Sequence, residues 1–341
     1  MTKLTKVNIN QSDLERLTNK TFDQLILEFL STKKSSQTQR AYKKDISTFF
    51  NALGIKTVGE LATLPVYELS KLIINYIESF KKTEEHRQDR IHNPRTLNRK
   101  AYALSSFFEY LVANYGYPRN PVKVYTPYST PDKTSTDDLE RIEVEAIWKR
   151  VNNEVEEAKT PFQQVSRTQQ KMIVSFLMLS LRRNEIAHLR WDDWDVQKGF
   201  ITIFWKGQKY KYLPLNQTMQ WYLHDYKALK KTHGYISPYL FSPIRNNSTS
   251  DGAKPISGSY IFNLVKKISK KLQINWSIRD DRTITPHSFR TTFVKMALNS
   301  GKTDIEIMNT TGHSTSQMVK YYDSRSALEV NAAGVVDDLL S

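Results

Sequence analysis

The sequence predicts a mainly α-helical protein of two domains, a helical first domain and an α-rich second domain with a small antiparallel β-sheet. Three observations lead to this fold class. Most apolar residues recur every three or four positions, as they do on one face of a helix. One stretch, around Lys206–Gln208, instead has apolar residues on both sides of a short turn, which is typical of a β-hairpin. The length of 341 residues fits two domains, each with its own core.

The first domain, residues 1–124, is predicted to consist of successive amphipathic helices. Apolar residues have helical spacing in four segments, 22–30, 36–53, 66–80 and 94–116. Gly54 stands where a helix end favours glycine, and Pro94 stands where a helix start favours proline. We interpret the charged stretch between the last two helices as a solvated connection.

Residues 125–138 form the clearest boundary in the chain. Their sequence, YTPYSTPDKTSTDD, is rich in Pro, Ser, Thr and Asp, which predicts a semi-extended linker. The second domain, residues 139–341, begins with a helix-like pattern over 139–155 and continues with an apolar helix over 172–179. The hairpin then falls within GFITIFWKGQKYKYLPL, and Pro286 marks the start of a later helix.

Composition and charge limit the classes of function. The 50 Lys and Arg residues outnumber 35 Asp and Glu, and the net charge of +15 favours a polyanionic partner, most commonly nucleic acid. Hydrophobic residues at 39% and charged residues at 25% exclude a disordered tail and a membrane protein. The absence of Cys excludes disulfides, thiol nucleophiles and thiolate metal sites. Together with an N-terminus that lacks an apolar signal segment, it predicts a cytoplasmic location.

Two segments combine basic residues with predicted helix ends or turns. In SLRRNEIAHLRWDDWD, Arg182 and Arg183 follow an apolar helix, where a guanidinium needs an anion as its partner. The alternative is an ordinary surface arginine pair, with Glu185 as the partner three residues away. Lys206 lies at the predicted hairpin tip, where most side chains are simply exposed.

Two further segments combine nitrogen donors and a tyrosine. In TPHSFRTTFVKMAL, His287 and Arg290 lie three residues apart on the first turn of a helix, where a phosphate would be favoured. A capping histidine with a solvated arginine is the alternative. In TGHSTSQMVKYYD, His313 precedes Tyr322 by nine residues, with a short helix-like segment between them.

In this order and spacing, the four segments resemble the tyrosine recombinase, or phage integrase, family, including its Xer-type site-specific recombinases. That family has a Gly-Leu-Arg-x-x-Glu box, a hairpin Lys before Gly, a His-x-x-Arg box, and a Gly-His followed by Tyr nine residues later. The matching residues are Ser180–Glu185, Lys206-Gly207, His287–Arg290, Gly312-His313 and Tyr322. Two residues depart from the pattern, because Ser180 replaces Gly and Thr311 replaces Leu. A serine adopts a left-handed backbone less readily than glycine.

The resemblance implies an enzyme that cuts and rejoins DNA through a 3′-phosphotyrosyl intermediate, with no cofactor and no metal. We therefore expect full activity in EDTA. It also assigns roles to the matching residues: Tyr322 as nucleophile, Arg182 and Arg290 as phosphate clamp, His313 as an added hydrogen-bond donor, His287 as proton acceptor, Lys206 as general acid, and Glu185 as the residue that orients a guanidinium. The family's spacing selects Tyr322 over Tyr321, which is assigned to packing.

The resemblance also implies partners. Both domains are expected to close around double-stranded DNA, as a homotetramer at a recombination site. The tail from Ala327 to Ser341 would dock into a neighbouring protomer. Basic residues are candidates for DNA contact, although such residues are more often simply solvated: Lys33, Lys34, Arg40, Arg95, Arg99, Lys100, Lys209 and Lys211.

Within the family, the sequence favours Xer-type chromosome dimer resolution in cell division, with a septal DNA translocase as a further partner, because no arm-binding domain is evident. Three alternatives stay open: an integrase of a mobile element, a type IB topoisomerase-like enzyme and a catalytically inactive DNA-binding accessory protein. The first domain and the apolar tail argue against a topoisomerase. The complete set of reacting residues argues against an inactive protein.

Overall fold

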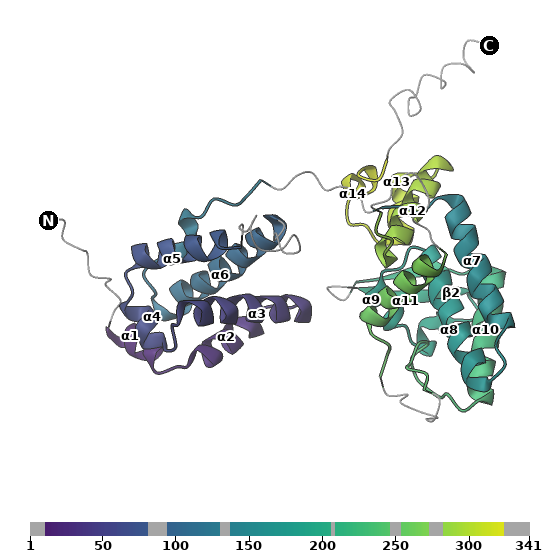
Figure 1. Cartoon of the computed structure of the whole chain (residues 1–341), viewed down its shortest axis with the longest axis horizontal. Coiled ribbons are helices and arrows are strands. Elements are labelled where there is room, and N and C mark those ends of the chain that lie inside the picture. Colours follow the sequence, from purple (N-terminus) through teal and green to yellow (C-terminus); the bar gives the residue numbers. More distant parts are fainter. Residues whose placement is uncertain are drawn as a thin grey trace, which may run out of the picture. The chain divides into compact units, whose positions relative to one another are not determined.

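The computed structural model describes residues 11–80, 94–129, 137–205, 209–245, 254–272 and 282–323. The chain divides into two compact units, Met1–Lys133 and Thr134–Ser341. Each unit has its own cluster of buried apolar residues. Helices make up most of both units, and a small antiparallel sheet lies in the second one (Figure 1). The predicted fold class is therefore confirmed.

Helices alone build the described part of the first unit. They are α1 (Gln11–Thr18), α2 (Phe22–Ser31), α3 (Ser36–Leu53), α4 (Val58–Thr63), α5 (Val66–Glu78), α6 (Pro94–Tyr115) and the 3-10 helix η1 (Pro121–Val124). The four predicted segments correspond to α2, α3, α5 and α6, whereas the short α1 and α4 were not predicted. Gly54 ends α3 with a φ of +68°, as the sequence indicated. The predicted solvated connection lies largely outside the described residues.

The core of the first unit is largely aromatic. Phe107 of α6 meets Phe29 of α2 and Phe50 of α3 in edge-on contacts, with ring centroids 5.5 and 5.9 Å apart. All three rings are buried, and burial of such a ring contributes about 1.5–3 kcal/mol. These contacts tie α2 and α3 to α6.

The two ends of segment 125–138 are packed. Tyr125 and Tyr128 lie against the first unit's core, and Tyr128 exchanges hydrogen bonds with the side chain of Asn98. At the other end, the carboxylate of Asp138 forms an ion pair with Lys295 of the second unit at 3.0 Å. The described residues at both ends of the predicted linker therefore belong structurally to the units that they join.

The second unit combines helices with a small sheet, whose inner face is buried and whose outer face carries the exposed Phe204, Tyr210 and Tyr212. Its elements are α7 (Arg141–Glu156), α8 (Pro161–Met178), α9 (Arg183–Ala187), η2 (Trp191–Asp193), β1 (Trp194–Asp195), β2 (Phe200–Trp205), β3 (Lys209–Pro214), α10 (Gln217–Thr232), α11 (Gly258–Lys271), α12 (Pro286–Asn299), α13 (Asp304–Thr311) and α14 (Ser316–Lys320). The strands are antiparallel in the order β1-β2-β3, with Ile201 opposite Leu213. The hairpin between β2 and β3 was predicted, and the two-residue β1 was not.

A small apolar cluster lies apart from the main core of the second unit. It consists of buried side chains from α12, α13, α14 and the residue that follows α14 closely: Val294, Leu298, Ile307, Val319 and Tyr322. This cluster holds the end of the described chain against the unit. Within the described ranges, no helix is both long and apolar enough to span a bilayer.

Candidate active site

The turn after α8 places the first arginine. Leu181 N–H donates to Phe176 O at 3.2 Å, and Ser180 N–H donates to Leu177 O at 2.9 Å. This Schellman arrangement requires a left-handed residue, and Ser180 supplies it with a φ of +68°. Ser180 therefore takes the backbone conformation for which the family uses glycine, and it does so with its side chain fully buried.

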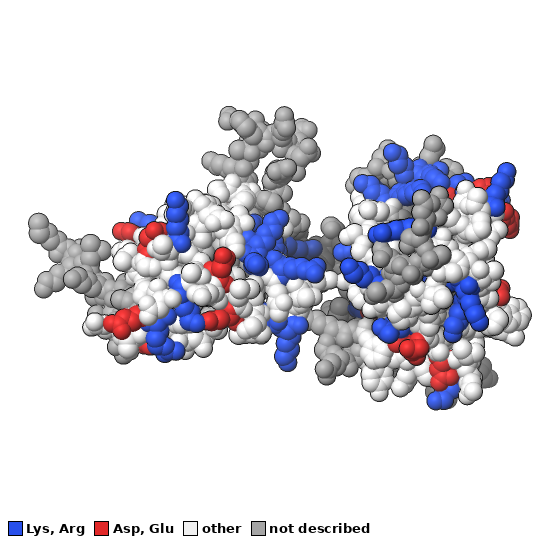
Figure 2. All heavy atoms as spheres, turned by 90° about the horizontal axis from the view of Figure 1, so that it is seen from below, with Lys and Arg blue, Asp and Glu red and all other residues white. Residues whose placement is uncertain are grey.

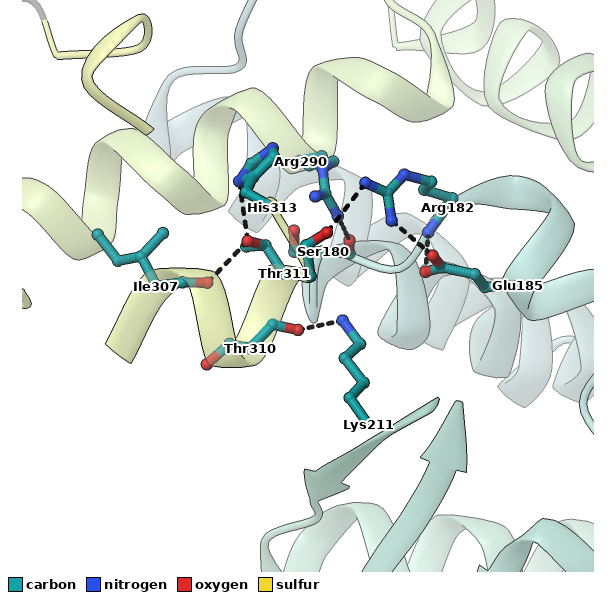
Figure 3. Close-up of polar contacts among 10 residues, drawn as sticks. Ser180, Arg182, Glu185, Lys211, Arg290, Ile307, Thr310, Thr311 and His313 are labelled. Atoms are coloured by element: carbon teal, nitrogen blue, oxygen red, sulfur yellow. Dashed lines mark hydrogen bonds and ion pairs between the residues drawn. The ribbon is translucent and has the colours of Figure 1, made fainter. Parts of the chain in front are cut away.

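Arg182 is fixed by its own helix start and by a distant turn (Figure 3). Its Nη1 donates to Glu185 Oε1 at 2.6 Å, and its backbone N–H donates to Glu185 Oε2 at 2.9 Å. Its Nη2 donates to the carbonyl of Gly312, 3.5 Å away. Glu185 is almost completely buried, while 39% of the Arg182 side chain is exposed. Glu185 and the carbonyl of Gly312 thus orient the guanidinium of Arg182, and the rest of this side chain is open to solvent.

Arg290 is the most unusual residue of the site, because only 1% of it is exposed. Its Nη1 donates to Ser180 O at 2.9 Å, whereas Nε and Nη2 have no hydrogen-bond partner among the described residues. Burial, and then the charge of Arg182, lower the pKa of Arg290 to about 10. Buried donors without partners are costly, so an anion at this position would be strongly favoured.

His313 lies beside the two arginines and is also buried. Its Nδ1 is 2.9 Å from Thr311 Oγ1, and the Thr311 hydroxyl donates to Ile307 O at 2.7 Å (Figure 3). Burial, and then the positive charges of Arg290 and Arg182, lower the pKa of His313 to about 3.

Tyr322 points into the same region. Its hydroxyl is 3.3 Å from Nε2 of His287, and its ring centroid is 5.7 Å from that of His313. Burial raises the pKa of Tyr322, and the charge of Arg290 acts in the opposite direction. Tyr321 differs, because it is 38% exposed. Its ring packs edge-on against that of Tyr322, with ring centroids 5.4 Å apart.

The environment of His287 favours its neutral form. Desolvation, and then the charges of Arg290 and Arg182, lower its pKa. Its backbone N–H is capped by the hydroxyl of Thr285 at the start of α12. Together with Arg182 and Arg290, His287 lines a pocket between α9, α11 and α12. Among the described residues, no three His, Asp or Glu side chains converge as a metal site requires.

The predicted hairpin lysines have different outcomes. Lys206 lies outside the described residues, as does the side chain of Lys209 in β3. Lys211 is buried on the inner face of β3, and its ammonium group donates to the carbonyl of Thr310 (Figure 3). Burial lowers the pKa of Lys211 to about 8. Lys211 thus holds the end of α13 to the sheet, just before Gly312 and His313.

The basic candidates of the first unit differ in exposure and in contacts. Lys34, Arg40, Arg95 and Arg99 are exposed. Lys33 donates to Ser106 Oγ at 3.0 Å, and both Arg99 and Lys100 pair with Asp45. Figure 2 shows acidic side chains lying among the basic ones on the displayed face of this unit.

The site thus brings together Arg182, Glu185, His287, Arg290, His313 and Tyr322 from α9, α12 and the segments that follow α13 and α14. Sequence reasoning did not identify Thr311 as the partner of His313. The substitution of a hydroxyl residue for leucine next to the Gly-His pair was the available signal. Sequence reasoning likewise did not identify the carbonyl of Gly312 as a contact of Arg182.

The chain is similar to known proteins in sequence and in fold. The sequence model of the phage integrase family matches residues 138–328. The chain belongs to the phage integrase family. Among its curated relatives, tyrosine recombinase XerD of Listeria innocua is 24% identical over 307 residues, which cover 87% of this chain and 91% of that protein.

Solved structures of the family share the fold. The Tn1549 transposon integrase, in complex with transposon right-end DNA, aligns with a TM-score of 0.60 at 16% identity and covers 94% of this chain and 100% of that one. XerH site-specific recombinase, bound to palindromic difH substrate, aligns with a TM-score of 0.57 at 14% identity and covers 98% of both chains. Its membership of the phage integrase family makes the protein a tyrosine-type site-specific recombinase, an enzyme of DNA strand exchange.

Proposed function

We propose that this recombinase cuts DNA by attack of the Tyr322 hydroxyl on a backbone phosphorus. The observation that carries the proposal is the position of this hydroxyl, 3.3 Å from His287 Nε2 and in the field of a buried arginine with two unpartnered donors. The products of attack are a 3′-phosphotyrosyl bond and a free 5′-hydroxyl. Attack by the 5′-hydroxyl of a second strand reverses the step, so one phosphodiester is exchanged for another and no ATP is consumed.

Arg182 and Arg290 form the proposed phosphate clamp. Negative charge accumulates on the non-bridging oxygens as phosphorus becomes five-coordinate, and planar guanidinium donors match those oxygens well. Arg290 supports this role through its free Nε and Nη2, and Arg182 through its solvent-facing side. Glu185 orients Arg182 from the buried side, and His313 contributes a further hydrogen bond.

His287 is the proposed proton acceptor for Tyr322. A phenol has an ordinary pKa of about 10, so at neutral pH it needs a nearby base or positive charge. The lowered pKa of His287 keeps this imidazole neutral and able to accept. Lys206 is proposed as the general acid that protonates the leaving 5′-oxygen, and it lies outside the described residues.

DNA contacts are proposed for both units. The exposed Lys34, Arg40 and Arg95 of the first unit are proposed to contact phosphates, and Lys209 of β3 is a further candidate. Lys33, Arg99, Lys100 and Lys211 already have contacts with their own chain, so we propose structural roles for them in the free protein. The linker at 125–138 would let the two units close around the duplex.

Assembly is proposed as a homotetramer on a DNA recombination site, with the C-terminal tail docked into a neighbouring protomer. The tail lies outside the described residues. Deletion of residues 327–341 tests this role: DNA binding should persist while cooperative synapsis is lost. Unaltered recombination by the truncated protein would contradict it.

We further propose Xer-type resolution of chromosome dimers in the cytoplasm, aided by a septal DNA translocase. The support is the relative named XerD, which aligns over most of both chains. Capture of covalently bound genomic fragments, followed by sequencing of their ends, tests this proposal. Enrichment of one chromosomal locus supports dimer resolution, whereas the ends of a mobile element would identify an integrase.

The central experiment uses a nicked suicide duplex, which traps the covalent intermediate. Because a topoisomerase-like enzyme would also form it, the second assay is strand exchange between two labelled duplexes. The wild-type protein should give both products, and Tyr322→Phe should give neither while still binding DNA. Tyr321→Phe is the matched control and should retain both. Covalent trapping by Tyr322→Phe would overturn the assignment.

A further inference from the structure

A buried threonine hydroxyl links His313 to the backbone of α13. Thr311 Oγ1 lies 2.9 Å from His313 Nδ1 and 2.7 Å from the carbonyl oxygen of Ile307 (Figure 3). Thr311 has no exposed surface, and only 6% of His313 is exposed. Buried polar groups of this kind are satisfied within the protein, so the pattern of donors and acceptors must be consistent along the chain.

The number of protons fixes the direction of both bonds. A carbonyl oxygen only accepts, so the single hydroxyl proton of Thr311 is donated to Ile307. The hydroxyl oxygen then accepts the other bond, and its hydrogen comes from Nδ1 of His313. A neutral imidazole carries one N–H. Nε2 of neutral His313 therefore has a lone pair and no proton.

We propose that Thr311 is a positioning residue that fixes the tautomer of His313 and makes its contact with the scissile phosphate depend on a second proton. This inference rests on the proposed function. Phosphate oxygens accept hydrogen bonds, so Nε2 binds one only as the N–H of an imidazolium. His313 is thus neutral in the free protein and cationic when it holds the phosphate.

The groups around His313 are consistent with this change of charge. The ionisable groups that face it from each packed element are Arg290 and His287 of α12, Arg182 before α9, Lys211 of β3 and Tyr322 after α14, with Glu185 behind Arg182. Burial and the positive groups lower the pKa of His313 to about 3, so the free site holds no imidazolium near neutral pH. A bound phosphate supplies the opposing negative charge, so its binding takes up a proton.

The family's usual leucine would not impose this requirement. A leucine side chain has no polar atom, so Nδ1 can lose its proton and neutral His313 can carry its proton on Nε2. That tautomer donates to a phosphate without protonation. Thr311 therefore gives this chain a dependence on proton concentration at a position where the family pattern has none.

The test compares three variants by single-turnover formation of the covalent complex across pH. Thr311→Val removes the hydroxyl and keeps the shape, whereas Thr311→Ser keeps the hydroxyl. Thr310→Val is the matched control, because the Thr310 hydroxyl donates to Glu306 O in the same way without contacting His313. In wild type, Thr311→Ser and Thr310→Val, the rate should fall about tenfold per pH unit above the pKa of bound His313. Thr311→Val should lose this alkaline decline.

A spectroscopic measurement on the free wild-type protein does not depend on the activity of any variant. The ¹⁵N spectrum of the histidine rings of the free wild-type protein, with His313→Asn for assignment, should show His313 protonated at Nδ1. An Nε2–H tautomer there, or an unchanged alkaline decline in folded Thr311→Val, would overturn the inference. Absence of any covalent complex from the wild-type protein at every pH would instead overturn the proposed function.

Discussion

Two buried cations, Lys100 in the first unit and Arg290 in the second, have opposite surroundings. Lys100 of α6 pairs with Asp45 of α3, a carboxylate that is 3% exposed, and the exposed Arg99 pairs with the same group. In the second unit, Arg290 is even more deeply buried, and no carboxylate among the described residues bonds to it. A cation with its own carboxylate is satisfied by the fold, whereas one without it gains stability from an anion that arrives from outside. The partner, rather than the charge, therefore distinguishes a structural cation from a candidate phosphate ligand.

Loss of the Arg290 donors should have the largest effect. Because its free Nε and Nη2 would receive the transition-state charge, Arg290→Lys should slow covalent-complex formation by about 10²–10³-fold. Lys295→Gln on the same helix is the matched control, since Lys295 pairs with Asp138 instead. The measurement is single-turnover trapping with DNA at saturation. Trapping by Arg290→Lys at the wild-type rate would show that the buried guanidinium is structural.

Acidification should have the next largest effect. His287 accepts a proton only in its unprotonated form, and its pKa is lowered from the ordinary value. As the pH is lowered past the ordinary histidine pKa of about 6.5, the trapping rate should therefore stay constant. It should fall about tenfold per pH unit only below the lowered pKa of His287. His287→Gln should be slow at all pH values and lack this decline. If the rate falls on acidification with a midpoint above the ordinary pKa of histidine, the lowered pKa of His287 is contradicted.

Removal of the Asp45 charge should take away the carboxylate partner of Lys100 and make its surroundings resemble those of Arg290. Asp45→Asn leaves Lys100 buried with a weaker partner, so the free energy of unfolding should fall by about 1–3 kcal/mol. Urea denaturation measures this change. Asp23→Asn, on the exposed first turn of α2, should be close to neutral. Equal stability of the two variants would mean that Asp45 does not hold these cations.

Exposed cations should give the smallest effect. Arg40→Gln should reduce the slope of log affinity against log salt by about 0.9, as expected for one lost phosphate contact. Arg99→Gln should change the slope less, because Arg99 is already bonded to Asp45. DNA-binding titrations at several salt concentrations measure both slopes. A larger change for Arg99→Gln would reverse the distinction between paired and free cations.

Helices and the hairpin could be predicted because their signals are local. Spacing alone indicated α3 and α6, and a glycine marked the end of α3. The buried state of Lys100 and Lys211 could not be predicted, because it depends on Asp45 and on the Thr310 carbonyl, which are distant in sequence. The candidate site was found through motif spacing, which places residues in order but gives no distances.

Single positions show the same limit. Ser180 was expected to adopt a left-handed backbone with difficulty, yet two backbone hydrogen bonds and full burial hold it there. Thr311 stood out only as a departure from a pattern. Its bond to His313 requires the bend at Gly312, which has a φ of +71°. Such contacts depend on backbone geometry that amino-acid type alone does not specify.

The small cluster around Tyr322 has a kinetic consequence. Among the described residues, its buried cluster consists of Val294, Leu298, Ile307 and Val319 besides the tyrosine, with Phe293, Ala297 and Met308 packed against it, and the main core of the unit lies apart. Release of the tyrosine thus exposes a few side chains and leaves the remainder folded, as in sub-global opening. Backbone amides of α14 should therefore exchange with deuterium sooner than those of α8. An enzyme that must switch its reactive group on and off could use this local opening without unfolding.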